Sequence, residues 1–466
     1  MSVRPFVSFD ADAPAARVQE GRAARLRTDA YLAFQALAPA FAFIRQRSNF
    51  ILGWEAAAAA GGPLASGASA GAVGEAGAPA LGSWMMLPDL TSPATQTVLP
   101  MNDSLYGAAH VELDRQGPVV LHVPADADGR YFSVTLLDGH FGNIAHLGPK
   151  WTGRGEVEVV LAPPGWSGDT GGRRVVESPT ASVCLLNRAL VRYHDSDLDR
   201  VRAWRHGFSI RPLAGPLVDV PHDDLVHPGI AVLDDPWEYL SICLKHVRRN
   251  PWPPEVRWVP EAVDLAALVD AADEPWSRAA VVHGFADAQA AIDATLTEWP
   301  TANGWRLPYR WIGHPTSHLA ENSALQLFQV GSNDSGEAVY YIGGADGEGR
   351  ALDGSDGAVY ELGFEADALP PVDPDGFWSL TMYGPDNLLV ANDLQRYSTR
   401  PTRPGFQLGT GGDVVITLSH ALPAGVPEAN WLPAPDGPFR LGLRLYYPQQ
   451  PVVDGTWRPP APRRAR

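Results

Sequence analysis

Two stretches of the chain, Val119–Asp138 (VVLHVPADADGRYFSVTLLD) and Val359–Gly384 (VYELGFEADALPPVDPDGFWSLTMYG), share one pattern. Each begins with a short apolar strand, continues through an acidic turn with Ala and Asp, and ends in an alternating aromatic and aliphatic segment. This alternation is typical of β-strands. The two segments align position by position, Tyr131-Phe132-Ser133-Val134-Thr135 with Phe377-Trp378-Ser379-Leu380-Thr381.

A second pair of similar segments follows in the same order. Pro163-Pro164-Gly165-Trp166 and then Leu186-Asn187-Arg188 parallel Asn430-Trp431-Leu432-Pro433 and then Leu441-Gly442-Leu443-Arg444. Two ordered matches predict that one β-sandwich unit occurs twice, with helical material between the copies. Convergence of similar strands is the alternative explanation.

The predicted fold class is therefore mainly β with helical additions: two antiparallel jelly-roll-like β-sandwiches, an N-terminal helical arm and a helical middle segment. The expected parts are 1–83 (helical arm and Ala/Gly-rich loop), 84–215 (first sandwich), 216–324 (helical segment) and 325–466 (second sandwich).

Apolar residues at helical spacing predict a helix over 15–47, with a kink or a break at Pro39. The expected helices of the middle segment are Trp237–His246, Glu261–Ala272 and Glu274–Trp299. The last part is expected to be β-patterned from its first apolar run, Leu325–Val330.

The charge balance argues against two classes of partner. The 466 residues include 53 acidic and 36 basic side chains, for a formal charge of −17. Nucleic acids and anionic membranes need basic surfaces, so we expect neither. No signal-peptide pattern and no apolar run of about 18–20 residues is visible, which favours a cytoplasmic protein. Homo-oligomerisation is left open.

The motifs of the two β-patterned parts resemble those of two bacterial families. The segment Asn102-Asp103-Ser104-Leu105-Tyr106, with Gly117–Val120 and Arg130–Val134, is similar to the domain-of-unknown-function family 1254. The C-terminal part resembles its usual companion, family 1214. Its matching blocks are Phe377–Tyr383, Asn392 with Arg396-Tyr397-Ser398, Asn430–Pro435, Leu443–Tyr446 and Asp454–Trp457. The resemblance implies two sandwiches plus a helical part and supplies no agreed activity.

One candidate site lies before a strand. Asn102, Asp103 and Tyr106 offer an amide, a carboxylate and a phenol, which could bind a polyhydroxylated ligand or act as acid and base. Alternatively, Asn102 and Asp103 satisfy backbone groups of a turn while Tyr106 packs.

A second candidate is the loop that follows a strand at Asp138. It carries Asp138, His140, Asn143 and His146, and loops at sandwich ends commonly hold sites. Gly139 and Gly142 interrupt the strand pattern, so three ligands are not expected to converge, and we predict no metal and no cofactor. A structural turn is the alternative.

Four arginines lie in or beside the repeated strands: Arg130, Arg188, Arg396 and Arg444. A buried guanidinium needs a partner, so each either pairs with a carboxylate or takes part in a clamp for an anionic ligand. Tyr397 and Trp431 complete the candidate ligand-binding residues, since aromatic rings can bind sugars, although core packing explains most tryptophans equally well.

Three further patterns are weaker. Gly67–Gly71 fits G-x-S-x-G, but it lacks the strand and helix that this motif requires. His222 and His227 are five residues apart, which is not the helical spacing of metal ligands. His314 and His318 do have i, i+4 spacing, but Pro315 between them argues for a loop.

These observations support two hypotheses of function. In the first, the protein is a hydrolase-type enzyme acting on a small polar or glycan-like molecule between the sandwiches. Asp103 or Asp138 would be the general acid or base, assisted by Tyr106 and His140, while Arg396 or Arg444 orients an anionic group. In the second, it is a non-catalytic ligand-binding or assembly protein.

Overall fold

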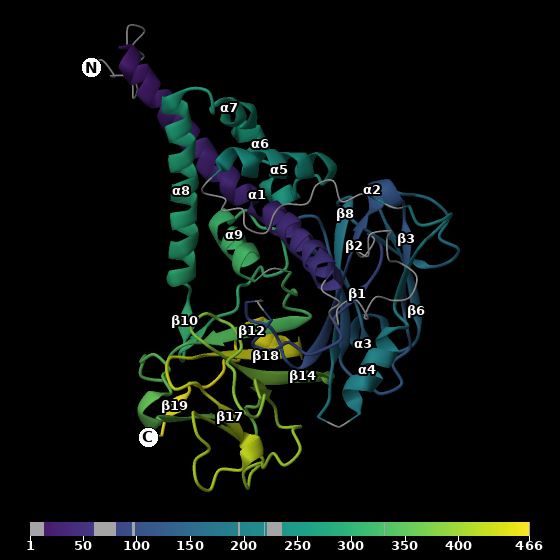
Figure 1. Ribbon diagram of the computed structural model, residues 1–466, viewed down its shortest axis with the longest axis vertical. Helices are drawn as coiled ribbons and strands as arrows, with labels where there is room; N and C mark the ends of the chain where they lie inside the picture. Colours follow the sequence, from purple (N-terminus) through teal and green to yellow (C-terminus); the bar gives the residue numbers. More distant parts are fainter. Residues whose placement is uncertain are drawn as a thin grey trace, which may run out of the picture.

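The computed structural model describes residues 14–59, 81–95, 98–193, 196–218, 220, 235–329 and 331–465, with side chains omitted for 52–59. It consists of a group of helices and two pairs of β-sheets (Figure 1). The expected fold class, mainly β with an N-terminal helix and a helical middle segment, is confirmed. The Ala/Gly-rich loop at 60–80, including Gly67–Gly71, and the His222/His227 pair lie outside the described residues.

The first sheet pair lies at the right of Figure 1 and encloses one apolar core. Side chains from both of its sheets, such as Leu105, Leu121, Leu136 and Leu161, meet in this core. The order of one sheet is β1 (Met85–Met86), β2 (Ser104–Glu112), β8 (Ser182–Leu190), β4 (Phe132–Leu137) and β5 (Asn143–Leu147). The other sheet contains β7 (Arg174–Glu177), β6 (Val157–Ala162), β3 (Val119–Val123) and β9 (Ser209–Pro212).

The second sheet pair lies at the bottom of Figure 1, around a core that includes Tyr341, Leu362, Leu380, Ile416 and Leu443. The order of one sheet is β10 (Thr301–Ala302), β11 (Trp305–Arg306), β12 (Ala338–Gly343), β18 (Arg440–Pro448), β14 (Val372–Tyr383) and β15 (Ser398–Thr399). The other sheet contains β17 (Trp431–Pro433), β16 (Val414–Ser419), β13 (Val359–Phe364) and β19 (Arg463–Arg464).

The strand orders of the two pairs correspond. The order β2-β8-β4-β5 matches β12-β18-β14-β15, and β7-β6-β3-β9 matches β17-β16-β13-β19. Ser133 lies opposite Arg188, and Ser379 lies opposite Arg444, so the serines aligned by sequence hold the same register. The sheets are not wholly antiparallel as expected, because β6–β7 and β16–β17 are parallel. The connections that precede β7 and β17 are long enough for the chain to return to the beginning of the previous strand, which parallel pairing requires.

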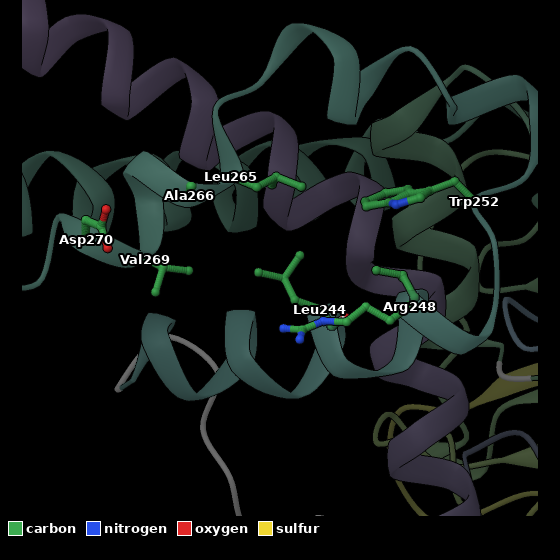
Figure 2. Close-up of a pocket in the computed structure, with 8 residues that line it drawn as sticks. Leu244, Arg248, Trp252, Leu265, Ala266, Val269 and Asp270 are labelled. Atoms are coloured by element: carbon green, nitrogen blue, oxygen red, sulfur yellow. The ribbon is translucent and has the colours of Figure 1, made fainter.

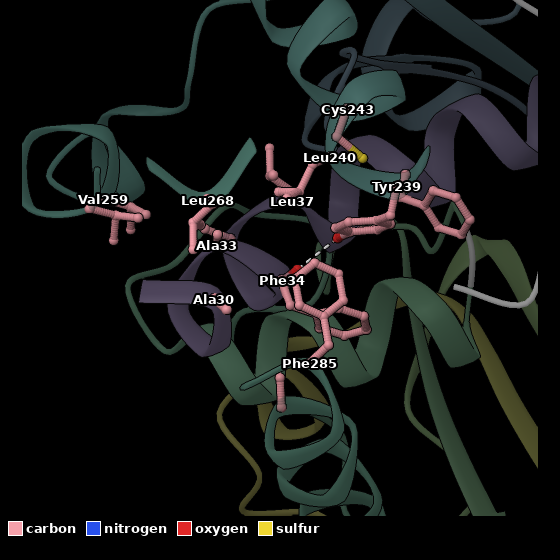
Figure 3. Close-up of a cluster of buried hydrophobic side chains, with 14 of the residues drawn as sticks. Ala30, Ala33, Phe34, Leu37, Tyr239, Leu240, Cys243, Val259, Leu268 and Phe285 are labelled. Atoms are coloured by element: carbon pink, nitrogen blue, oxygen red, sulfur yellow. Dashed lines mark hydrogen bonds between the residues drawn. The ribbon is translucent and has the colours of Figure 1, made fainter. Parts of the chain in front are cut away.

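The helices form a third unit with its own apolar core. Long helix α1 (Ala15–Ala59) packs against α5 (Pro236–Arg249), α8 (Pro275–Thr297) and α9 (Leu319–Phe328). Phe34 of α1 lies against Tyr239 of α5 and Phe285 of α8, and Tyr239 donates a 2.7 Å hydrogen bond to the Phe34 carbonyl (Figure 3). Because this burial holds α1 on both sides of Pro39, the helix continues through the proline and does not break there.

Two other helical expectations are corrected. The predicted helix Glu261–Ala272 is divided into α6 (Val259–Ala262) and α7 (Leu265–Asp270), where Asp264 caps α7 by accepting from Ala267 N–H. The apolar run at Leu325 ends helix α9 and does not begin a strand. A run of six apolar or amide residues is too short for its periodicity to distinguish the two structures, and packing on α1 and α8 favours the helix.

Short helices complete the described structure. They are α2 (Leu113–Gln116), α3 (Pro149–Thr152), α4 (Asp197–Arg205), η2 (Pro254–Val256), η3 (Ser355–Gly357), η4 (Glu428–Asn430) and α10 (Gln450–Val453).

The outer face of the β2-β8-β4 sheet is covered by two different neighbours. At one end Cys184 and Leu186 pack with Phe43 of α1. At the other end Leu190 and Tyr131 pack with Tyr446 of β18 in the second pair. The second cover brings the two sheet pairs together through the β8 and β18 faces, where the candidate site lies.

Candidate functional site

Matching rows of polar side chains lie on the two facing sheets. In the first pair, Tyr106 of β2 and Ser133 of β4 both lie opposite Arg188 of β8. In the second pair, Tyr340 of β12 and Ser379 of β14 both lie opposite Arg444 of β18. We call these two Tyr-Arg-Ser rows the arginine–tyrosine layer. Residues opposite one another on adjacent strands project to the same face, so each row is one continuous surface.

Arg188 is only 6% exposed and bonds to the second sheet pair. Its Nη1 donates to Asn333 Oδ1 (3.0 Å) and Thr135 Oγ1 (3.3 Å), and its Nη2 donates to the Gly331 carbonyl (3.3 Å). Asn333 Nδ2 in turn donates to the Tyr340 hydroxyl (3.0 Å). Asn333 therefore links Arg188 of one row to Tyr340 of the other.

Arg444 is 5% exposed and has the corresponding contacts in the opposite direction. Its Nη1 donates to Thr381 Oγ1 (3.3 Å), and its Nη2 donates to the Leu99 carbonyl, which belongs to the first pair (2.7 Å). Leu99 stands seven residues before Tyr106, as Asn333 stands seven before Tyr340. Each arginine thus reaches the same position of the other unit.

The structure separates the two interpretations of the four arginines. Arg130 pairs with Asp197 (3.1 Å) and Asp128 (2.7 Å), and Arg396 pairs with Glu428 (2.7 Å), so both are held by carboxylates. Within the described ranges, neither Arg188 nor Arg444 forms an ion pair. Glu337 acts on Arg188 only electrostatically, without a direct ion pair. A buried guanidinium without a direct ion pair is costly, which distinguishes these two arginines from Arg130 and Arg396.

Arg205 is a third buried guanidinium without an ion pair in the described part of the chain, but its environment differs. Its Nε donates to Asn187 Oδ1 (3.0 Å), its Nη1 donates to the Leu87 carbonyl (3.0 Å), and its Nη2 donates to the Tyr106 carbonyl. Burial lowers the pKa of Arg205 to about 9. It lies on the core side of the sheet and fixes β1 to β2, so it is structural.

Hydroxyl groups beside the two arginines have unused bonding capacity. The Oγ atoms of Ser104 and Ser379 are buried and have no hydrogen-bond partner in the described structure. Tyr106 and Tyr340 are half-buried, so water reaches their edges of the layer. Burial raises the pKa of Tyr340 and, well above its ordinary value, that of Tyr446. These phenols stay protonated at neutral pH and can donate to an acceptor.

One buried carboxylate precedes each row. Asp103, the predicted acid or base, accepts a 2.8 Å bond from Arg400 of the second pair. Glu337 holds the same position before β12 and accepts from the Tyr131 hydroxyl (2.5 Å) and Trp151 Nε1 (2.6 Å) of the first pair. Burial raises the pKa of Glu337. Each carboxylate contacts the other sheet pair, Asp103 through Oδ1 alone, since its Oδ2 is buried without a hydrogen-bond partner in the described structure.

The structure separates the predicted residues of the Asp138 loop: Asp138 and His140 contact their own turn and the end of α5, whereas His146 contacts Thr135, which bonds to Arg188. Asp138 Oδ1 accepts the backbone N–H groups of His140 and Gly142 (both 2.8 Å), which closes its own turn, and burial raises its pKa. His140 Nε2 lies 3.1 Å from the Asn250 carbonyl, next to α5. Asn143 Nδ2 donates to the Gly313 (3.0 Å) and Ser332 (2.9 Å) carbonyls. Each observed contact ties the loop to its neighbours.

The remaining predicted residues are dispersed. Asn102 donates to the Thr91 carbonyl, and Arg396 bonds to the Trp431 carbonyl (3.1 Å) at the edge of the second pair. Tyr397 packs with Tyr383 and Leu389. Of the predicted set, the layer therefore brings together Tyr106 and Arg444.

Tyr340, Ser133 and Ser379 belong to the layer but were not predicted as site residues, and Arg188 was considered only among four arginines with two open interpretations. The sequence signal that could have identified them is the alignment of Ser133 with Ser379, because each serine lies opposite one of the two arginines, Arg188 or Arg444.

A polar cluster lies beside the first row. His146 Nε2 is 3.0 Å from Asp334 Oδ2, and His146 Nδ1 is 3.3 Å from Thr135 Oγ1. His314 is 4.0 Å from the same Asp334 oxygen, and the His146 contact helps to lower the pKa of Asp334 against its burial. Across the described ranges, no three His, Cys, Asp or Glu side chains are grouped so as to hold a metal ion.

A cavity of about 470 Å³ lies in the helical unit, far from these polar groups. Figure 2 shows it between α5 and α7, with Leu244 and Val269 across the space, Trp252 at one end and Asp270 at the other. Its lining is largely apolar, and Arg248 and Asp270 are exposed at its edge. It offers volume but no converging acid, base or nucleophile.

Two solved structures are similar to this chain, and the first of them supports the fold. The chain is similar over 95% of its length to the whole VPA0106 protein from Vibrio parahaemolyticus, with a TM-score of 0.65 and 18% identity. An uncharacterized protein from Burkholderia cenocepacia matches 93% of this chain and 97% of its own, with a TM-score of 0.41 and 15% identity. No curated protein matches the chain. None of the described helices has the length and apolar character needed to cross a membrane.

Two family models match the two sheet pairs. The model of a protein family of unknown function, DUF1254, matches residues 82–212, which contain the first pair. The model of a second family of unknown function, DUF1214, matches residues 337–450, which contain most of the second. The resemblance drawn from the sequence motifs is confirmed, and the chain combines a DUF1254 domain with a DUF1214 domain.

Proposed function

We propose that the protein binds a small anionic molecule in the arginine–tyrosine layer. The observation that carries this proposal is that Arg188 and Arg444 are buried without an ion pair in the described chain, whereas Arg130 and Arg396 have carboxylate partners. A carboxylate or phosphate group would supply the missing countercharge, and the planar guanidinium suits such groups.

The neutral groups of the layer support the same chemistry. Ser104 and Ser379 have hydroxyls without partners in the described structure, and the half-buried Tyr106 and Tyr340 provide phenols at the edge. A polar ligand would satisfy these groups, while its apolar part would contact rings such as Phe377.

The hydrolytic reaction expected from the sequence stays a prediction. Asp103 and Asp138, its acid–base candidates, are held by Arg400 and by the Asp138 turn respectively, so ligand binding has the stronger support. A cytoplasmic location, jelly-roll connections, homo-oligomerisation and the absence of nucleic-acid or membrane partners also stay predictions.

We also propose that the two sheet pairs are copies of one ancestral unit. Their matching strand order, the two Tyr-Arg-Ser rows and the equivalent positions of Asp103 and Glu337 support this interpretation. It explains why the candidate ligand site is built from matching residues of both units.

Calorimetric titration of the full chain tests the binding proposal. Succinate, acetate and inorganic phosphate are compared with uncharged glucose and glycerol, using wild type, Arg188→Met, Arg444→Met and the control Arg211→Met. Arg211 is an exposed arginine on β9 paired with Glu158. Binding of an anion that both layer variants lose and the control keeps would support the proposal. Equal binding by all four proteins, or no anion binding by wild type, would overturn it.

A further inference from the structure

The arginine–tyrosine layer has a two-fold relationship that constrains its ligand. Arg188 bonds to Asn333 and Arg444 bonds to Leu99, and these acceptors occupy equivalent positions in opposite units. The Tyr106-Arg188-Ser133 row therefore has a counterpart in Tyr340-Arg444-Ser379. A ligand held by both rows would meet one buried arginine at each end.

The charge of the layer points to more than one acidic group. A monoanion would neutralise one buried guanidinium and leave the other without a countercharge. Glu337 is the carboxyl that acts on Arg188, but its oxygens bond to Tyr131 and Trp151 and form no ion pair in the described chain. Asp103 is likewise paired with Arg400. Two separated acidic groups would balance the two arginines.

The rows also hold hydrogen-bond donors for each end. In the second row Ser379 Oγ is unpartnered within the described structure, and Tyr340 is half-buried. Near the first row, Ser104 Oγ is similarly unpartnered and Tyr106 is half-buried. An acidic group at either end would thus find one guanidinium, one serine hydroxyl and one phenol.

We infer that the ligand is a small dianion with two separated carboxylates, each held by one arginine of the two matching rows. This inference rests on the proposed anion-binding function and specifies its substrate class. A short dicarboxylate is the simplest molecule of this type, because its two ends are alike, as the two rows are.

Titration with matched acids tests this assignment on the full chain. The probes are malonate, succinate, glutarate and adipate, each compared with its monomethyl ester, which has the same backbone and one charge fewer. We expect the dicarboxylic acid of one chain length to bind at least about 10-fold more tightly than its own monomethyl ester. Arg188→Met and Arg444→Met should each abolish that preference, while Arg211→Met should retain it.

Three outcomes separate this inference from the proposal beneath it. If neither the dicarboxylic acids nor their monomethyl esters bind, both the dianion inference and the anion-binding proposal are overturned. Equal affinity for diacid and monoester overturns the dianion and leaves anion binding intact. If a methionine variant does not fold, Arg188→Lys and Arg444→Lys keep the charge but lose the planar fork, and an unchanged diacid preference in both would contradict the two-arginine arrangement.

Discussion

Asp103 and Glu337 occupy the same place in the two sheet pairs, three residues before Tyr106 and Tyr340, but they are stabilised differently. Asp103 forms a buried ion pair with Arg400, whereas Glu337 accepts neutral donors from Tyr131 and Trp151. One side of the junction between the units is therefore fixed by an ion pair and the other by hydrogen bonds from neutral donors. The comparison teaches that equivalent backbone positions keep their geometry while the charges around them change.

Breaking the two junctions should cost unequal amounts. Asp103→Asn leaves the buried Arg400 guanidinium without its countercharge and should lower the free energy of unfolding by about 3–5 kcal/mol. Glu337→Gln breaks no direct ion pair and removes one acceptor of the Tyr131 and Trp151 bonds, so it should cost about 1–2 kcal/mol. Urea unfolding at pH 7 measures both changes. The double variant Asp103→Asn, Arg400→Met is the control and should recover much of the loss; equal costs for the single variants would contradict the distinction.

The two layer arginines should also differ in their effect on stability. Arg188 makes two hydrogen bonds to the opposite unit, with Asn333 and the Gly331 carbonyl, and Arg444 makes one, with the Leu99 carbonyl. Without ligand, Arg188→Met should therefore lower the free energy of unfolding by about 2 kcal/mol and Arg444→Met by about 1 kcal/mol or less. Urea unfolding measures the difference, with Arg211→Met expected to change little. A larger loss for Arg444→Met would reverse the comparison.

The pH dependence isolates Glu337. Burial raises its pKa in the folded chain above the ordinary value of 4.5, so the folded protein holds this proton more tightly than the unfolded chain. The resulting stabilisation is present below about pH 4.5 and is lost as the pH rises through the folded-state pKa. Unfolding of wild type and Glu337→Gln from pH 4 to 8 should show wild type losing stability relative to the variant. A constant difference would contradict the raised pKa.

The matched serines should give the smallest effects. The Ser133 hydroxyl is 3.2 Å from that of Tyr131, whereas Ser379 Oγ has no partner in the described chain. Ser133→Ala should lower the free energy of unfolding by about 1 kcal/mol, while Ser379→Ala should be neutral or slightly stabilising, because it removes an unsatisfied buried hydroxyl. If Ser379→Ala costs as much as Ser133→Ala in urea unfolding, the hydroxyl has a partner in solution.

Local sequence patterns predicted the strands of both units because alternation and aligned turns are local properties. They placed Ser133 and Ser379 in equivalent segments, and the registers of β4–β8 and β14–β18 agree. The short run at Leu325 was assigned to the wrong element because its structure depends on packing against α1 and α8. The local pattern gave the wrong secondary structure at Leu325 because contacts with helices distant in the sequence determine it.

The candidate site was predicted only in part for a related reason. Tyr106 and Arg444 were identified, and Arg188 was recognised among four arginines with two open interpretations. Which arginines are paired depends on carboxylates such as Asp197 in α4 and Glu428 in η4, whose distance from the strands the sequence does not reveal. That Arg188 and Arg444 form no ion pair in the described ranges can be seen only once the positions of the carboxylates are known.

The position of α1 in the chain has a consequence for biosynthesis. A ribosome makes Phe34 and the other apolar residues of α1 long before it makes Phe285 of α8 and the residues of α9 that cover them. During this interval the nascent chain carries the apolar residues of α1 without the later helices that bury them. Productive folding of the helical unit must wait for late translation, and interrupted products would be prone to self-association or capture by chaperones.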